Sequence, residues 1–215
     1  MKFLTFDTET TGLPRDKRGR IEDSSNWPYI LQLSWILYDN ETNRLFKSND
    51  IIELPDSVEI SKESIAVHGI TRKRSRDDGI PIKKAIVKLQ KAMADANVII
   101  AHNLEFDKKL VMAECARNKM RHEFYNNKGY YCTMKNSVNL CKIEATNITT
   151  GEKYFKYPRL SYLHEFLFGT TPMGTHDALV DILVCFRCYY KIVYHMDIAS
   201  RNRQIGALMT KMCKI

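Results

Sequence analysis

The stretch that decides the fold reads Phe3-Leu-Thr-Phe-Asp7-Thr8-Glu9-Thr10-Thr11-Gly12-Leu13. Its apolar half predicts a strand over residues 2–7. Because alternate residues of a strand share a face, Asp7 and Glu9 point the same way. Two like charges held side by side are unfavourable unless cations neutralise them. The pair therefore predicts half of a site for Mg²⁺ or Mn²⁺, and the alternative is two solvated acids at a strand edge.

Length and composition indicate one ordinary globular domain. The chain has 215 residues, of which 44% are hydrophobic, enough for one well-buried core. No apolar stretch is long enough to cross a bilayer, and Asp7 comes too early for a signal peptide. We expect an intracellular protein without a membrane partner, with one domain over residues 1–195 and a helical tail over residues 196–215.

Six cysteines are expected to be free thiols in a reducing compartment. Cys185 and Cys188 have the spacing of half a zinc site. They fall inside a strongly helical stretch and no second CxxC pair accompanies them, so zinc is not expected.

The net charge of +8 favours a polyanionic partner. Basic residues gather in residues 15–20 and again in residues 72–76. Both clusters are interpreted as solvated loops, or as contacts to a nucleic-acid backbone that read no base sequence.

Hydrophobic periodicity predicts alternating elements. Strands are expected over residues 2–7, 29–38, 44–52, 97–101 and 130–132. Helices are expected over residues 61–68, 81–95, 104–120, 160–168 and 176–195, with another starting near 133. Residues 15–27 are interpreted as a long loop without a packing signal, and residues 142–157 as a hairpin or excursion. This order is typical of the α/β class, a mixed sheet flanked by helices.

Two further acids follow later in the chain. Asp107 falls in the first turn of a predicted helix, where negative charge is favourable. Asp181 falls one turn inside a helix that Thr175 would cap, on an otherwise apolar stripe. An aspartate in such a position is rarely buried without a partner or a metal. Taken singly, each acid is more often an ordinary cap or surface charge.

Together these residues resemble the three motifs of the DEDDh family of 3′→5′ exonucleases. Asp7-x-Glu9 is similar to the first motif, Asp107 after His102-Asn103 to the second, and His176 ahead of Asp181 to the third. Residues 6–13, 65–71 and 132–134 resemble the branch that contains the proofreading subunit of bacterial replicative polymerase. The resemblance implies an RNase H-like fold, in which a five-stranded mixed sheet carries the first carboxylates on its central strand.

The resemblance also implies roles for these residues and a cofactor of two divalent metal ions, Mg²⁺ or Mn²⁺. Asp7 would bridge the two ions, Glu9 and Asp181 would complete the site nearest the attacking water, and Asp107 would belong to the second metal site. Two ions stabilise the entering and leaving oxygens of a phosphodiester displacement. His176 would be the general base, since an imidazole with a pKa of about 6.5 is largely neutral near pH 7.

Six residues would lie at the substrate by the same resemblance: Thr8, Thr10, Thr11, Leu13, His68 and Asn103. Leu13 is either an apolar wedge against the terminal base or an anchor into the core. Asn103 either binds the terminal nucleotide or caps the helix that carries Asp107. His68 either lies near the penultimate base or simply ends its helix.

The function expected is a metal-dependent 3′→5′ exonuclease that releases nucleoside 5′-monophosphates from single-stranded or frayed ends, with DNA favoured. A polymerase or replication assembly is a candidate partner. Two alternatives stay open: a nucleic-acid-binding module that has lost turnover, and an RNA-trimming enzyme of the oligoribonuclease type. Loops 15–27 and 142–157 depart from the family's pattern, so the choice between DNA and RNA stays open.

Overall fold

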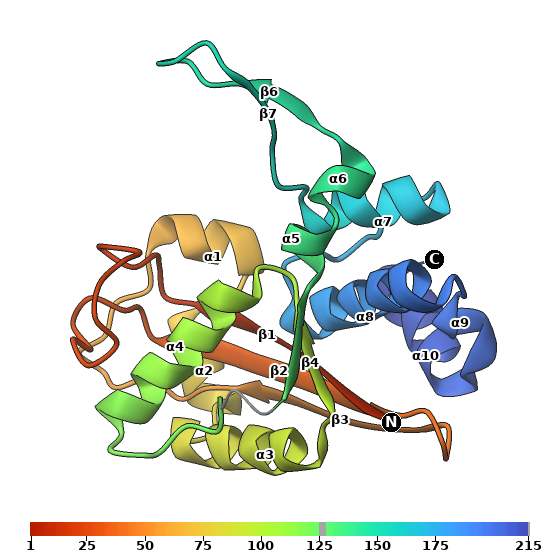
Figure 1. Cartoon of the computed structure of the whole chain (residues 1–215). Helices are drawn as coiled ribbons and strands as arrows, with labels where there is room; N and C mark the ends of the chain where they lie inside the picture. The colour runs from red at the N-terminus through yellow and green to blue at the C-terminus, as the bar shows by residue number, and fades with distance from the viewer. Residues whose placement is uncertain (125–127, 215) are drawn as a thin grey trace.

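A five-stranded mixed sheet forms the centre of the molecule (Figure 1). The computed structural model describes residues 1–124 and 128–214. The strands are β1 (Lys2–Thr10), β2 (Ile30–Asp39), β3 (Arg44–Ile51), β4 (Val98–Ala101) and β5 (Gly129–Cys132), in the order β3-β2-β1-β4-β5. β1 is central, antiparallel to β2 and parallel to β4. The predicted five-stranded α/β architecture is confirmed.

Helices cover both faces of this sheet, and a separate hairpin projects from it (Figure 1). The helices are α1 (Lys62–His68), α2 (Arg72–Asp78), α3 (Ile82–Asp95), α4 (Leu104–Arg117), α5 (Thr133–Asn136), α6 (Val138–Cys141), α7 (Leu160–Phe168), α8 (Ala178–Tyr194), α9 (Ile198–Arg201), α10 (Arg203–Leu208) and the π-helix η1 (Met209–Cys213). The hairpin consists of β6 (Glu144–Thr146) and β7 (Lys153–Phe155), as predicted for residues 142–157.

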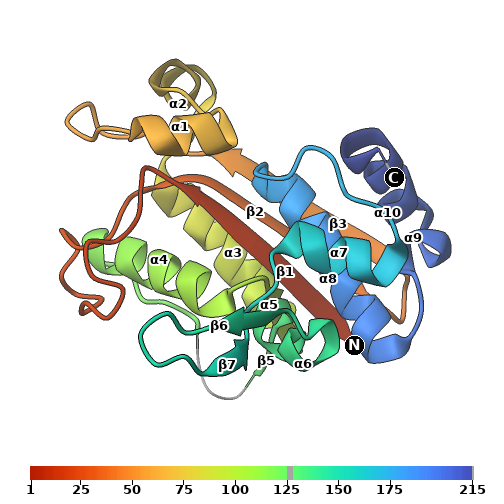
Figure 2. The ribbon, with the colours of Figure 1, turned by 90° about the horizontal axis from the view of Figure 1, so that it is seen from above.

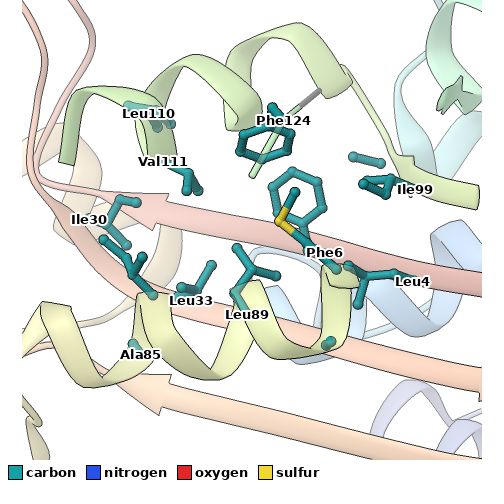
Figure 3. Packing of buried hydrophobic residues seen from close by; sticks show 14 of the residues in the cluster. Leu4, Phe6, Ile30, Leu33, Ala85, Leu89, Ile99, Leu110, Val111 and Phe124 are labelled. Atoms are coloured by element: carbon teal, nitrogen blue, oxygen red, sulfur yellow. The ribbon is translucent and has the colours of Figure 1, made fainter. Parts of the chain in front are cut away.

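The period of two along β1 divides the interior into two cores. Leu4 and Phe6 pack with Leu89 of α3 and Val111 of α4 on one face (Figure 3). Phe3 points to the other face and packs against α8. Figure 2 shows α8 on one side of β1, with α3 and α4 on the other. The central strand is thus held from both sides.

The C-terminal segment completes the second core. Ile198, Ile205, Met209 and Cys213 are buried in the same cluster as Phe3 and the apolar residues of α8. Where one added helix was predicted, this segment forms two short α-helices and a π-helix. A domain boundary at residue 195 stays a prediction.

Two polar segments are more ordered than predicted. Residues 15–27 were expected to lack a packing signal, yet Trp27 is buried and Ile21 packs against the first core. Trp27 Nε1 also donates a hydrogen bond to the carbonyl oxygen of Arg20 at 3.0 Å. Arg117 of α4 also donates hydrogen bonds to the carbonyl oxygens of Ser24 and Trp27, so both apolar packing and hydrogen bonds anchor this charged loop.

The basic cluster of residues 72–76 forms helix α2, so its interpretation as a loop was wrong. Thr71 caps this helix by accepting a hydrogen bond from the backbone N–H of Arg74. Two of the charges then pair at helical spacing, and a third pairs with an aspartate twenty residues earlier in the sequence. These pairs are Lys73–Asp77, Arg74–Asp78 and Arg76–Asp56. The cluster is largely neutralised by its own neighbours.

All six cysteines are buried free thiols, as predicted. In the described part of the chain, no group of potential metal ligands includes Cys185 or Cys188. None of the helices in that part has the length and apolar character required to cross a bilayer.

The packing of the C-terminal segment is tested by the substitution Ile205→Ala. Ile205 is fully buried, so we expect the free energy of unfolding to fall by about 2–5 kcal/mol in urea titrations. Val87→Ala, at a position that is 41% exposed on α3, is the control and is expected to change stability by less than about 0.5 kcal/mol. Equal stability of the two variants would show that residues 196–215 do not support the core.

Candidate active site

Three carboxylates converge beside the C-terminal half of β1. Asp7 and Glu9 lie on the face of the strand that α8 covers, and Asp181 lies in the first turn of α8. One oxygen atom from each of the three side chains lies within 4.8 Å of the other two. Residues that are far apart in the sequence thus form one acidic group.

The start of α8 places Asp181. The helix begins at Ala178, two residues later than predicted, and its cap is Asp177 where the sequence suggested Thr175. The Asp177 side chain accepts hydrogen bonds from two N–H groups of the first turn. Gln32 of β2, which lies opposite Glu9, accepts a further one from the N–H of Ala178 at 3.2 Å. The helix end is therefore fastened directly to the sheet.

Asp107 approaches from the other layer of the fold. It lies in the first turn of α4 and is 2% exposed. Its Oδ1 accepts hydrogen bonds from the N–H of Thr8 at 3.2 Å and from the Thr8 hydroxyl at 2.7 Å. Asp107 is not one of the three clustered acids, but it lies close enough for its charge to raise the pKa of Asp7.

Burial and mutual repulsion make the charged state of these acids costly. Burial is the main cause that raises the pKa of Asp7 well above its usual range, and Asp107, Asp181 and Glu9 add to it. Burial, then the charges of Asp181 and Asp107, raises the pKa of Glu9 to about 8. The pKa values of Asp107 and Asp181 rise to about 7, again chiefly through burial. A bound cation would reverse this penalty.

The donor set fits divalent cations. No ion pair formed by the described part of the chain includes Asp7, Glu9, Asp107 or Asp181. Four carboxylates without a cationic partner offer only hard oxygen ligands, which suit Mg²⁺ and Mn²⁺. Three of them could hold one ion, whereas the place of a second is not defined by this geometry.

His176 lies at the mouth of the same site. It precedes α8 in a turn, with a left-handed backbone (φ 74°) and an exposed side chain. Its backbone N–H donates to Asp181 Oδ2 at 3.1 Å. His176, Asp7 and Asp181 line one hollow of about 510 Å³, so the imidazole has access to the space above the carboxylates.

The threonines after Asp7 are largely bonded within the protein. The Thr8 hydroxyl and N–H both donate hydrogen bonds to Asp107. The Thr10 hydroxyl donates one to the Gly12 carbonyl oxygen at 2.7 Å. Thr11 accepts a hydrogen bond from the N–H of Tyr29 through its hydroxyl oxygen. These contacts shape the turn beside the acids. Contact of Thr8, Thr10 and Thr11 with a terminal sugar stays a prediction.

The other three predicted substrate residues have distinct environments. Leu13 is 74% exposed, so its interpretation as a core anchor was wrong. Asn103 precedes α4 with a left-handed backbone and makes no side-chain cap, so the capping interpretation was also wrong. His68 Nδ1 accepts from the N–H of Ile70, and its Nε2 lies 3.1 Å from the carbonyl oxygen of Thr10. His68, the last residue of α1, therefore contacts the backbone of the turn that follows β1. Contact with the penultimate base stays a prediction.

Sequence reasoning missed the residues around the exit of the hairpin. Tyr157 and Arg159 line the hollow that contains Asp7 and His176. His102 lines the same hollow, with its ring nitrogens 2.9 Å from the Thr133 hydroxyl and 3.1 Å from the Pro158 carbonyl oxygen. Burial lowers the pKa of His102 to about 4, so this ring is neutral. The alternation of Lys, Tyr, Phe and Arg in residues 153–159 was an available signal.

The raised pKa values predict how stability depends on pH when divalent cations are removed. Glu9 binds its proton more tightly in the folded state, so its contribution to stability is lost as pH rises through about 8. Glu9→Gln should therefore melt higher than the wild type at pH 8.5. The expected difference is at least about 2–4 °C, the shift that one kcal/mol produces in a domain of this size.

The measurement is the melting temperature by circular dichroism in EDTA, from pH 6 to pH 8.5. The difference between wild type and Glu9→Gln should grow over this range, because ionisation of Glu9 is absent in the variant. Excess Mg²⁺ should raise the melting temperature of the wild type more at pH 8.5 than at pH 6. If the difference in melting temperature between the two proteins shrank with rising pH, the raised pKa of Glu9 in the folded state would be contradicted.

Comparison with known proteins places this geometry in a family. The family model described as Exonuclease (RNase_T) matches residues 4–189. No match is found among curated proteins.

Solved structures share the fold at low sequence identity. The crystal structure of Escherichia coli Exonuclease I in complex with a dT13 oligonucleotide has a TM-score of 0.64 at 16% identity and covers 88% of this chain. The chain spans only 41% of the length of Exonuclease I. Cell-death related nuclease 4 has a TM-score of 0.66 at 13% identity and covers 91% of this chain and 64% of its own.

The nuclease domain of 3′hExo, a DEDDh family member bound to rAMP, matches over most of both chains. It has a TM-score of 0.64 at 14% identity and covers 90% of this chain and 92% of its own. The polymerase-proofreading branch stays a prediction. The match over residues 4–189 shows that this chain belongs to the RNase_T exonuclease family, as its resemblance to the DEDDh exonucleases predicted.

Proposed function

We propose that this protein is a metal-dependent 3′→5′ exonuclease that releases nucleoside 5′-monophosphates from single-stranded or frayed ends. The observation that carries the proposal is the convergence of one oxygen each from Asp7, Glu9 and Asp181 within 4.8 Å. No ion pair among the described residues neutralises them. Such a site is unfavourable for the protein alone. It becomes favourable when divalent cations bind, which is the state that phosphodiester hydrolysis requires.

Asp7, Glu9 and Asp181 would hold one cation, and Asp7 with Asp107 a second. Two bound Mg²⁺ or Mn²⁺ ions would stabilise charge on the entering and leaving oxygens. Asp107 takes part if it exchanges a hydrogen bond from Thr8 for a ligand, or if its second oxygen is used. The buried position of Asp107 favours such a role, since an unpaired buried carboxylate is costly.

His176 would accept the proton of the attacking water. Its imidazole is exposed at the rim of the hollow that contains Asp7 and Asp181. The hydrogen bond from its backbone N–H to Asp181 fixes the turn that carries it. A histidine whose backbone is tied to a ligand carboxylate is well placed to act on a water beside that ligand.

The turn after β1 would receive the last nucleotide. Leu13 is largely exposed, as a wedge against a terminal base requires. The Asn103 side chain makes no helix cap, so its amide is available to the terminal nucleotide. His68 would act by holding the carbonyl of Thr10 in place. Preference for DNA and association with a polymerase or replication assembly remain parts of this proposal.

The alternative of a binding module without turnover is disfavoured by the complete set of acids and His176. An RNA-trimming activity uses the same chemistry and differs only in the polymer that the site admits. Both alternatives are separated from the leading proposal by one assay.

The proposal predicts a ladder of products that shortens from the 3′ end. Purified protein is incubated with 5′-labelled single-stranded DNA or RNA and with Mg²⁺ or Mn²⁺. EDTA should abolish cleavage, and Asp7→Ala should lower the rate by at least about 10³-fold, because loss of a bridging ligand disrupts both cation sites.

Asp95→Ala, at an exposed acid at the end of α3, serves as the matched control and should retain full activity. Binding of both polymers without cleavage would support the module without turnover. Cleavage of RNA alone would support the RNA-trimming enzyme. Products that shorten from the 5′ end would contradict the proposed polarity.

The role of His176 predicts a separate effect on rate. His176→Ala should lower kcat by about 10²–10⁴-fold, the usual contribution of a general base. Binding of Mn²⁺, measured by calorimetry, should persist because no ligand carboxylate is removed. His195→Ala is the control. His195 is also exposed and has a left-handed backbone conformation, but it lies at the other end of α8. Unchanged turnover in His176→Ala would remove its role as the base.

A further inference from the structure

Exposed aromatic side chains are concentrated on and after the hairpin. Within residues 1–124 and 128–214, six Tyr or Phe side chains are largely exposed. Five of them fall in one segment of thirteen residues: Tyr154, Phe155, Tyr157, Tyr162 and Phe166. The sixth is Phe46, on the edge strand β3. Aromatic rings exposed in one contiguous region mark an interaction surface more often than single exposed residues do.

The hairpin is not built to bury these rings in the protein. β6 and β7 form a two-stranded sheet of their own, and every residue of β7 is exposed. The hairpin stands away from the body of the molecule (Figure 1). Its strands alternate, so Tyr154 points to one face and Lys153 and Phe155 to the other. The aromatic groups are therefore available to a partner.

Positive charges alternate with these rings. Lys153, Lys156 and Arg159 are all exposed, and the ion pairs of the described residues include none of them. The sequence contains no acidic residue between Glu152 and Glu165. This differs from α2, where Lys73, Arg74 and Arg76 each form an ion pair with an aspartate. In this segment, cations that form none of the ion pairs of the described residues thus lie next to exposed rings.

The same segment leads into the catalytic hollow. Tyr157 and Arg159 line this hollow together with Asp7, His176 and Asp181. The carbonyl oxygen of Pro158, between them, lies 3.1 Å from a ring nitrogen of half-buried His102. The exit of the hairpin is thereby fixed at the acidic site, while its tip extends into solvent.

We propose that residues 153–159 bind the single-stranded part of the nucleic-acid substrate that lies upstream of its 3′-terminal nucleotide. This inference rests on the proposed function and extends it to the substrate beyond the scissile bond. Bases would stack on Tyr154, Phe155 and Tyr157, and phosphates would pair with the cations of this segment. Stacking of this kind tolerates any base because every base has a π face.

The test measures binding separately from cleavage. The variant Asp7→Asn in EDTA prevents hydrolysis, and fluorescence anisotropy reports binding of 5′-fluorescein-labelled (dT)15 and (dT)3. Tyr154→Ala/Phe155→Ala should weaken binding of (dT)15 about 10-fold or more and leave (dT)3 nearly unchanged. Phe46→Ala removes an exposed ring outside the segment and should change neither affinity. Equal melting temperatures of the variants exclude unfolding.

The dependence of (dT)15 affinity on salt concentration tests the contribution of Lys153 and Lys156. Lys153→Gln/Lys156→Gln should lower the slope of log K against log salt by about 1.4, since each phosphate contact on a single strand contributes about 0.7. The matched pair Lys73→Gln/Arg74→Gln on α2 should leave the slope unchanged. An unchanged affinity for (dT)15 in the aromatic variant, or an equal loss for (dT)3, overturns the proposal.

The two proposals fail in different ways. If the wild type binds (dT)15 but releases no nucleotide from it, the proposed exonuclease function fails and the binding segment stands. If the wild type degrades (dT)15 and both hairpin variants bind it like the wild type, the function stands and the binding segment fails. In that second case the exposed rings would serve a different partner.

Discussion

The rest of the structure depends on holding three carboxylates together against their mutual repulsion. The positions of Asp7 and Glu9 are set by β1, which is the central strand and is packed on both faces. Asp181 is held because Asp177 and Gln32 fasten the start of α8 to the sheet. Burial of apolar residues in the two cores offsets the electrostatic cost. The fold thus maintains an arrangement of like charges that is electrostatically unfavourable for the protein alone.

The fourth acid shows that the site draws on both layers of the molecule. Asp107 belongs to α4, on the face opposite α8, and reaches the strand through Thr8. Because successive side chains of a strand point to opposite faces, Asp7 and Glu9 of β1 face the layer of α8, and Thr8 faces the layer of α4. A site assembled across a central strand resists distortion, because neither layer can move without disturbing the sheet.

A basic segment of this sequence indicates a binding surface only once the ion pairs of its side chains are known. Two segments are similarly basic in sequence. Three of the four cations of α2 pair with Asp56, Asp77 and Asp78, whereas the ion pairs of the described residues include no cation of residues 153–159. Net charge predicted a polyanionic partner, and it did not indicate which segment would contact one. The pairing depends on helical spacing and on a loop distant in the sequence.

The sequence by itself determined the elements and the identity of the acids. Periods of two and 3.6 located the five strands and the main helices, and the spacing of Asp7, Glu9, Asp107, His176 and Asp181 indicated the family. Only the tertiary structure decided that Asp177 caps α8, that the Asn103 side chain caps nothing, and that Leu13 lies exposed. Local patterns depend on neighbours along the chain, whereas caps, hydrogen-bond partners and exposure depend on residues that folding brings from elsewhere.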